Sequence, residues 1–315
     1  MDARSMKWTK LGLIFRPENT SDWMASHACL PLPDMVSANV LRIYFATRST
    51  QNKSSITFIE VEADNPTKVL YMHDKPVLSP GKLGTFDDDG VGPYSLVTLG
   101  SKKYLYYGGV NASVTVSCRN AIGLAVSEDN GLTFERVYDG PVVDRNAREP
   151  YFTAAADVMH CGDHWKMWYA SATGWLVVNG KPEPRYQIKY GHSSDGINWS
   201  RDNTTCIEYT LEGEANVRPC VILEDGLYRM WYCYRGSVNY RTDKAQSYRL
   251  GYAESSDGIK WNRKDDEVGI SRSEEGWDSI MMCYPYLYQH RDRKYLLYNG
   301  NGFGESGFGY AVLED

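Results

Sequence analysis

Acidic and basic side chains recur in five short stretches of this sequence, and each stretch stands just before an apolar segment. The stretches read SDWMASHACLPL, GTFDDDGVGPY, NAREPYFTAAAD, GEANVRPCV and GWDSIMMCYPY. Carboxylates that meet in one pocket can cleave a glycosidic bond, because one protonates the leaving oxygen while another activates water or attacks carbon. The pattern therefore raises the hypothesis of acid–base chemistry on a sugar.

Four carboxylates are the candidates for this chemistry. We expect Glu214 or Glu149 to act as the general acid, and Asp88 or Asp89 to act as the base or stabiliser. Crowding raises the pKa of one carboxyl group in such a site, while a nearby arginine keeps another ionised. The residues expected to hold the substrate are Trp23, His27, Asp87, Arg148, Arg218, Asp278 and Tyr284.

Each candidate also has a structural alternative. Glu214 and Arg218 would then form an ion pair that braces adjacent inner strands, and Glu149 would tie blades together through Arg148. The acids of FDDD would lie on a solvated loop, Trp277 beside Asp278 would only pack, and His27 would be a hydrogen-bonded core histidine. The sequence leaves these alternatives open.

The elements that would position these side chains form a repeat. Segments 32–48, 94–109, 156–171, 220–235 and 286–301 each combine an apolar strand, a polar turn and a strand ending in aromatic residues. In each segment the last apolar residue before the turn, the anchor, lies ten positions before the closing aromatic, and successive anchors are 62 to 66 residues apart. The pairs are Met35/Phe45, Val97/Tyr107, Met159/Tyr169, Ile222/Tyr232 and Tyr288/Tyr298. Four antiparallel strands per unit, repeated around a ring, predict an all-β, five-bladed β-propeller that forms a single domain over residues 1–315.

The two ends of the chain complement each other in this scheme. The fifth unit stops at GFGYAVLED, which is its third strand, and residues 6–15 near the start of the chain, MKWTKLGLIF, have the pattern of a fourth strand. Pairing them closes the ring and removes the exposed edges that invite aggregation. We therefore predict that the N-terminal strand completes the last blade.

An Asp motif occurs three times, as SEDNGLTF, SSDGINW and SSDGIKW. Asp-Gly is a hairpin dipeptide, since glycine supplies the positive φ and the aspartate bonds back to nearby amides. We predict that these motifs are structural turns after the third strand, and that Phe134, Trp199 and Trp261 pack between blades.

Composition narrows the function classes. The net charge of −6 and the absence of a basic run argue against nucleic acid and against an anionic membrane. No apolar stretch approaches the length of a membrane span, and the first ten residues, MDARSMKWTK, lack the apolar core of a signal peptide. Seven scattered cysteines fit reduced thiols, so we expect a cytoplasmic protein. We expect no metal and no cofactor.

The five predicted blades, together with FDDDGVGP, Arg148-Glu149-Pro150, GEANVRPCV, GWDSIMMCYP and YNGNGFGESGFGYA, resemble the five-bladed propeller glycosidases. This superfamily includes arabinanases, xylosidases, invertases and levansucrases, and the chain looks most like its relatives encoded among bacterial polysaccharide genes. The resemblance implies a glycoside hydrolase-like enzyme that acts on a small or activated sugar in a central funnel. Such enzymes place an Asp on each of the first two blades and a Glu on the third, near the start of the inner strand and often before a proline.

The sequence departs from that pattern near the anchors. About four residues before them stand Pro31, Pro93, Ala155, Arg218 and Tyr284, and Glu149-Pro150 alone looks like the acid–proline motif. Two alternatives to hydrolysis therefore stay open. The chain could be a non-hydrolytic sugar-processing enzyme, such as a transferase, lyase or cyclase, or a propeller that binds carbohydrate without turnover. The expected ligand is a carbohydrate or a nucleotide sugar; retention or inversion, the anomer and the oligomeric state are not predicted.

Overall fold

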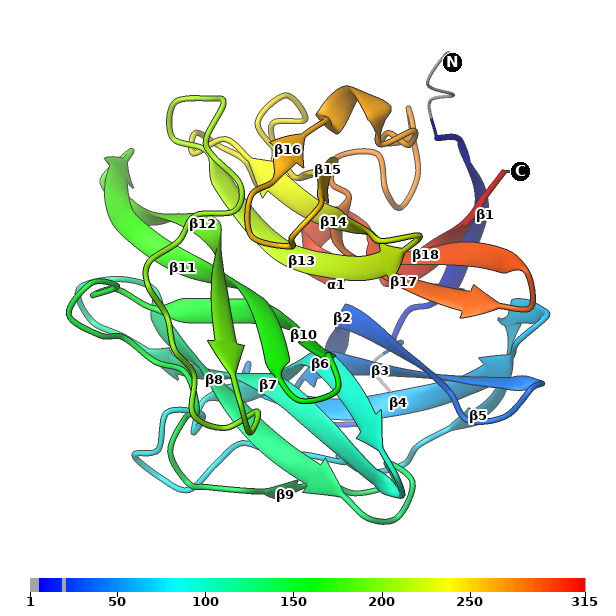
Figure 1. Cartoon of the computed structure of the whole chain (residues 1–315). Coiled ribbons are helices and arrows are strands. Elements are labelled where there is room, and N and C mark those ends of the chain that lie inside the picture. The colour runs from blue at the N-terminus through cyan, green and yellow to red at the C-terminus, as the bar shows by residue number, and fades with distance from the viewer. Residues whose placement is uncertain (1–5, 19–20, 315) are drawn as a thin grey trace.

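The computed structural model describes residues 6–18 and 21–314, and it consists almost entirely of β-strands (Figure 1). The largest sheet contains β2 (Ser26–Met35), β3 (Val40–Arg48), β4 (Ser54–Glu62), β5 (Asn65–Met72), β6 (Gly90–Leu99), β7 (Lys102–Ala112), β8 (Cys118–Ser127) and β9 (Glu135–Arg136). The other three sheets contain β10 (Thr153–His160), β11 (Trp165–Val178) and β12 (Lys181–Ser193); β13 (Ala215–Glu224), β14 (Leu227–Arg235), β15 (Arg249–Ser255) and β16 (Asn262–Arg263); and β17 (Cys283–His290), β18 (Arg293–Asn299), β19 (Phe308–Leu313) and β1 (Trp8–Phe15). The helical segments are η1 (Asp265–Glu267) and α1 (Asn301–Gly304). The predicted all-β class is confirmed.

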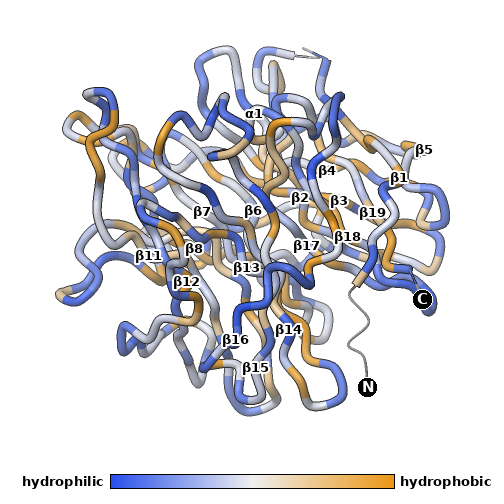
Figure 2. Tube along the Cα trace, turned by 90° about the horizontal axis from the view of Figure 1, so that it is seen from above, coloured by the Kyte–Doolittle hydropathy of each residue, from blue (hydrophilic) through white to orange (hydrophobic). Residues whose placement is uncertain are grey.

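The eight-stranded sheet is two groups of strands joined at one point. A single parallel residue pair, Ser54 with Gly90, connects β4 to β6, whereas the other strand pairs are antiparallel. The first strands of the repeated segments contact one another in the cyclic order β2, β6, β10, β13, β17 and back to β2. Figure 2 shows β2, β6, β13 and β17 near the centre of the trace, with β5 and β15 towards its edge. The sheets are therefore arranged around a common axis, while the count of five blades stays a prediction.

The N-terminal strand completes the last sheet, as predicted. β1 pairs antiparallel with β19, and the register runs from Trp8 opposite Leu313 to Phe15 opposite Phe308. Figure 1 shows β1 lying along the sheet formed by β17, β18 and β19. Backbone groups at the two ends of the chain thus satisfy each other.

The three Asp motifs adopt the same turn. In the first motif the Ser127 hydroxyl donates to Asp129 Oδ1 over 2.7 Å and accepts from the Gly131 amide, while the amides of Leu132 and Thr133 donate to Asp129 Oδ1. The motifs at residues 193–199 and 255–261 repeat these bonds. The acids are fully used within their turns, so the structural interpretation of the motif is confirmed.

Each of these turns also ties two repeated units together. The glycine carbonyl of the turn accepts a hydrogen bond from an aromatic side chain of the preceding unit: Tyr44 to Gly131 (2.9 Å), Tyr106 to Gly196 (2.7 Å) and Trp168 to Gly258 (2.7 Å). The closing aromatic of the motif packs edge-on against the same ring, with centroids 5.8 to 6.2 Å apart: Phe134 on Tyr44, Trp199 on Tyr106 and Trp261 on Trp168. The predicted packing between units is therefore confirmed.

Among the described residues no helix is long and apolar enough to cross a membrane. All seven cysteines are free thiols, as the sequence predicted.

Acid should weaken the Asp turns. Burial alone raises the pKa of Asp129, but hydrogen bonds from Thr133, Ser127 and two amides lower it from 3.8 to about 2. Because the folded pKa is depressed, the stability that this carboxylate contributes is present above about pH 4 and is lost as the pH falls towards 2. We expect Asp129→Asn to be less stable than the wild type at pH 7, with the difference shrinking below pH 4. Urea unfolding between about pH 7 and 2.5 measures this. Asp292→Asn, an exposed substitution, is the control, and a pH-independent difference for Asp129→Asn would contradict the assignment.

Candidate active site

Four of the predicted site acids lie in buried ion-pair clusters of one kind. In the first, Asp87 is fully buried, and its Oδ2 accepts from Arg136 Nε (2.8 Å) and from the Tyr107 hydroxyl (3.1 Å). Arg136 comes from β9 at the outer edge of the sheet, and Tyr107 comes from β7. The tyrosine ring lies over Gly123, where a Cβ would come within 2.3 Å of it. Acid, cation and ring therefore lock the strands of one unit together.

The same arrangement recurs at the third unit. Glu149 is 1% exposed and accepts from the Tyr169 hydroxyl on β11 (2.9 Å) and from Arg201 Nη1 (3.3 Å). The predicted partner, Arg148, is 68% exposed and lies 4.0 Å from Asp202. The structure thus gives Glu149 a bracing role like the alternative stated from the sequence, but through Arg201 instead of Arg148.

The last unit uses a lysine from the other end of the chain. Asp278 is 2% exposed, and its Oδ2 accepts from Lys10 Nζ on β1 (2.5 Å) and from the Tyr298 hydroxyl on β18 (3.1 Å). Trp277 stacks on Tyr298 with ring centroids 5.0 Å apart. The N-terminal strand therefore supplies the counter-charge for an acid near the C-terminus.

The fourth cluster differs from the other three in one contact, because its tyrosine bonds to a second carboxylate and not to the buried acid. The first unit lacks both the acid and the tyrosine. Glu214 is fully buried and pairs with Arg263 Nη1 over 2.6 Å, while Tyr232 donates to Asp265, which also pairs with Arg263. At the corresponding spacing the first unit has Ala25 and Phe45 in place of the acid and the tyrosine. Acid and hydroxyl are replaced together, as expected for partners in a structural cluster.

A cavity separate from these clusters lies where the first strands of the repeated units are bulged. Each first strand has a break in register near its middle, between Cys29 and Leu32 on β2 and at matching places on β6, β10, β13 and β17. Leu30, Ala155, Arg218 and Tyr284 adopt positive φ at these bulges, at 46° to 60°. Bulges re-aim side chains and commonly border functional sites. Here they surround a cavity of about 380 Å³ to which all five first strands contribute.

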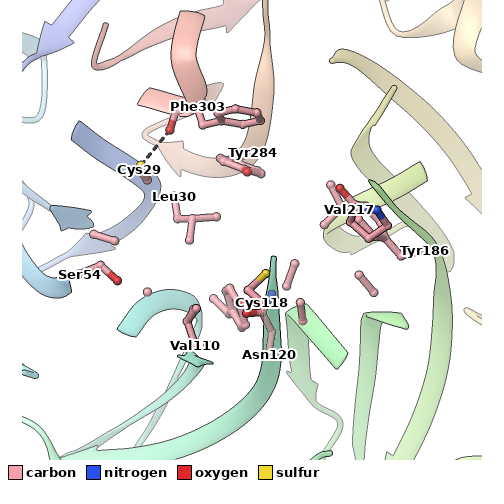
Figure 3. Close-up of a pocket in the computed structure, with 18 of the residues that line it drawn as sticks. Cys29, Leu30, Ser54, Val110, Cys118, Asn120, Tyr186, Val217, Tyr284 and Phe303 are labelled. Carbon is pink, nitrogen blue, oxygen red and sulfur yellow. Dashed lines mark hydrogen bonds between the residues drawn. The ribbon is translucent and has the colours of Figure 1, made fainter. Parts of the chain in front are cut away.

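The lining of this cavity is aromatic and cationic. Its rings are Tyr94, Phe152, Tyr186, Tyr240, Tyr248, Tyr284 and Phe303, and its charged side chains are Arg48, Arg235 and Arg241. In the described part of the chain no Asp or Glu lines it. Figure 3 shows Tyr284 and Phe303 on one side, Cys118 and Asn120 on another, and Tyr186 beside Val217 on a third. Rings of this kind offer flat apolar faces to a sugar, and the polar groups between them fix its orientation.

The structure does not bring the predicted catalytic carboxylates together in this cavity. Glu149 and Glu214 lie in the separate clusters described above. Asp88 accepts from the Gly84 amide (2.8 Å), a bond that lowers its pKa, and Asp89 accepts from the Ala112 amide (2.8 Å). Asp89 lies next to the cavity through its backbone, since its amide donates to the carbonyl of Val110, a lining residue.

The predicted substrate-holding residues are also dispersed. Tyr284 lines the cavity, whereas Arg218 is fully buried beside it and donates to the Tyr94 carbonyl. His27 bonds to Ser26, and burial together with nearby Arg48 lowers its pKa to about 4, so it is neutral at pH 7. Trp23 packs against an apolar core cluster. Asp87, Asp278 and Arg148 lie outside the lining, as described above.

Two lining arginines were missed, although the repeat contained a signal for them. Arg48 and Arg235 are the last residues of β3 and β14, three positions after the closing aromatics Phe45 and Tyr232. Val110 holds the same position in the second unit and also lines the cavity. The position three residues after the closing aromatic, near the end of the second strand, would have identified lining residues better than the stretch before the first strand.

No family model matches the chain. It is 40% identical over 311 residues to two proteins of Mycobacterium tuberculosis described as uncharacterised, MT1551 of strain CDC 1551 / Oshkosh and Rv1502 of strain ATCC 25618 / H37Rv. The matches cover 98% of this chain and 100% of each relative.

Several solved structures with a similar fold are described as glycoside hydrolases. A structure of BT0996, described as an RGII complex, has a TM-score of 0.75 at 16% identity and covers 98% of this chain and 92% of its own. A glycoside hydrolase has a TM-score of 0.72 at 17% identity, with 98% and 91% covered. A thermostable family-43 glycoside hydrolase has a TM-score of 0.66 at 15% identity, with 94% and 90% covered. At such identities the likeness shows the fold, and the predicted resemblance to the propeller glycosidases is confirmed at that level.

Removing a buried acid should cost stability. Glu149→Gln leaves Arg201 without its counter-charge, so we expect a loss of about 3–5 kcal/mol in the free energy of unfolding. Glu128→Gln is the matched control: its carboxylate is 71% exposed and pairs with Lys102, and we expect a change of about 0–1 kcal/mol. Urea unfolding at neutral pH measures both variants. If Glu149→Gln kept full stability but lost turnover, Glu149 would be catalytic and the structural assignment would fail.

Proposed function

This chain belongs to the same family as MT1551 and Rv1502 of Mycobacterium tuberculosis, and we propose that it is a glycoside hydrolase-like enzyme that binds a carbohydrate in its central pocket and acts on a glycosidic bond there. The observation that carries the proposal is a cavity of about 380 Å³, lined by seven aromatic rings, at the axis of a fold shared with glycoside hydrolases. We count the eight-stranded sheet as two blades, which makes a five-bladed propeller. A carbohydrate ligand is also supported by the solved neighbour described as an RGII complex.

The proposed chemistry does not use the four buried acids, because neither these acids nor the side chains that bond to them line the cavity. Among the described residues, Glu183 is the one carboxylate that accepts hydrogen bonds from side chains of the lining. It accepts from the Tyr240 hydroxyl (2.9 Å) and from Arg241 Nη1 (2.6 Å). Burial raises the pKa of Glu183, but the bonds from Arg241 and Tyr240 outweigh it and hold the pKa below 4.5. Glu183 is therefore ionised at neutral pH.

A hydroxyl bonded to a carboxylate that a third group orients is the arrangement of an activated nucleophile or a proton relay. Tyr240 lines the cavity, Glu183 is its acceptor, and Arg241 holds Glu183 through both carboxylate oxygens. Burial raises the pKa of the Tyr240 hydroxyl, and the charge of Arg235 acts against that rise. The guanidinium carbon of Arg235 lies 3.7 Å from the centre of the Tyr240 ring, where it favours a developing phenolate. We assign Tyr240 as the group that meets the sugar and Glu183 as the acceptor of its proton.

A second candidate function is carbohydrate binding without turnover. The observation that favours it is the lack of an Asp or Glu side chain in the lining, counted over the described residues. A nucleotide sugar, which the sequence left open, finds no support in the descriptions of the neighbours. We keep the cytoplasm as the proposed location because the chain carries scattered free thiols.

Variants of the Tyr240–Glu183 pair test the enzyme against the binding protein. On a panel of aryl glycosides we expect Tyr240→Phe and Glu183→Gln to lower kcat by about 100-fold or more, with little change in KM. The acid limb of the pH profile of kcat should lie below the range in which an ordinary glutamate titrates, because Glu183 works in its ionised form and its pKa is lowered. Glu224→Gln removes an ion-paired carboxylate outside the lining and should leave kcat unchanged.

Three outcomes are decisive. Turnover that survives both substitutions would overturn the assignment of Tyr240 and Glu183. Carbohydrate binding in calorimetry without turnover of any glycoside would favour the binding protein. No binding and no turnover would refute the proposed function as a whole.

A further inference from the structure

The cavity carries more positive charge than its own carboxylates neutralise. Arg241 is paired with Glu183, but among the described residues no carboxylate oxygen lies within 4.0 Å of the guanidinium nitrogens of Arg48 or Arg235. Within the same described ranges, the side chain of Arg48 makes one hydrogen bond, a long one of 3.5 Å to Asn52 Oδ1. The chain as a whole has a net charge of −6, so the positive charge at this cavity is opposite in sign to the charge of the whole chain.

Arg235 is the more unusual of the two because it is fully buried. Its guanidinium donates to the Gly236 carbonyl (2.8 Å), the Pro184 carbonyl (2.9 Å) and the Tyr248 hydroxyl (3.3 Å), all of which are neutral. Burying a cation with no carboxylate at ion-pair distance is unfavourable, whereas a bound anion would offset that cost. The site therefore favours a negatively charged ligand.

The hydroxyl hydrogens next to Arg235 show how that ligand would be held. Arg235 can only donate, so Tyr248 accepts from it, and the hydroxyls of Tyr248 and Tyr186 share one further hydrogen bond. Two hydroxyls carry two hydrogens, and this shared bond uses one of them. The other hydrogen has no acceptor among the described contacts of either residue, and both tyrosines line the cavity. Whichever tyrosine keeps it presents an O–H donor, backed by a buried cation.

A third group in the lining is a hydrogen-bond acceptor, so it would bind a donor of the ligand and not an anion. Asn120 lines the cavity, and its buried Oδ1 accepts no hydrogen bond from the residues that the structure describes. A sugar hydroxyl would satisfy it, since hydroxyls are donors as well as acceptors. The lining therefore combines aromatic faces, an acceptor for a hydroxyl and donors for an anion.

From this arrangement we infer that the pocket recognises an anionic sugar, with the Tyr186–Tyr248 pair and Arg235 facing its carboxylate or phosphate and Arg48 adding attraction from the lining. The inference rests on the proposed function for the identity of the site, but it concerns binding and not cleavage. A uronate and a sugar phosphate present the same chemistry to these groups, so the test separates them.

The test compares sugars that carry a carboxylate or a phosphate with the neutral sugars from which they derive. Calorimetry in low-salt buffer at pH 7 would use the methyl glycosides of glucuronate, galacturonate and mannuronate, the 6-phosphates of the parent glycosides, and the neutral parent glycosides themselves. We expect at least one uronate or phosphate to bind about tenfold or more tighter than its neutral parent, and this preference to fall as salt rises. The arm with the tighter ligand identifies carboxylate or phosphate.

Three variants locate the preference in the pocket. Arg48→Gln and the double variant Tyr186→Phe/Tyr248→Phe, which removes both hydroxyls of the pair, should each reduce the ratio of anionic to neutral affinity about three- to tenfold, and Arg235→Lys should reduce it if the variant folds. Arg293→Gln, on an exposed arginine outside the lining, should leave the ratio unchanged.

Equal affinity for each anionic sugar and its neutral parent would overturn the inference, as would a preference that neither Arg48→Gln nor the double variant Tyr186→Phe/Tyr248→Phe alters. These results are distinguishable from a failure of the proposed function. Turnover of neutral glycosides alone would retain the function and refute the anionic ligand, whereas charge-dependent binding without turnover would retain the ligand and refute the enzyme.

Discussion

The pairing of β1 with β19 is the interaction on which the rest of the molecule depends. It joins the two ends of the chain, so the first strands of all the units can contact one another in a closed order. It also brings Lys10 to Asp278, a carboxylate that would otherwise be buried without a counter-ion. Backbone pairing and charge neutralisation therefore favour the same closed state. The pocket depends on it too, because its lining draws on every first strand.

Buried charge explains why acids are so frequent before the first strands. Asp87, Glu149, Glu214 and Asp278 each meet a cation from the outer part of their own unit, or from β1 in the last case. Such clusters contribute less to net stability than to specificity of pairing, because desolvation offsets much of the Coulomb attraction. What they enforce is register, since a shifted outer strand would leave both charges unpaired. Ring-to-turn bonds such as Tyr106 to Gly196 then hold neighbouring units in place.

The pocket is built by a different device. Bulges at matching places on the first strands turn side chains towards the axis, and residues such as Ala155 and Tyr284 accept positive φ there. Backbone strain of this kind persists only when the surrounding sheet over-determines it. In this fold the bulges surround a cavity whose wall is cationic, while the acids are held away from it in their ion pairs.

The sequence by itself determined the repeat, the all-β class, the ring closure through the N-terminal strand and the structural role of the Asp motifs. These follow from local patterns: strand alternation, turn residues and a period of about 63 residues. The sequence also identified one stretch that borders the cavity, because Tyr284, a predicted substrate-holding residue, lines it.

Only the tertiary structure decided which charged groups meet. Glu149 finds Arg201, fifty-two positions away, and Asp278 finds Lys10 from the other end of the chain. Spacing within one unit cannot reveal a partner that arrives from another strand, and so it cannot tell an acid that is already neutralised from one that is free to react. Arg48 and Arg235 share one position in the repeat, but that position alone does not say which way their side chains point. The bulges and sheets around them decide that both line the pocket.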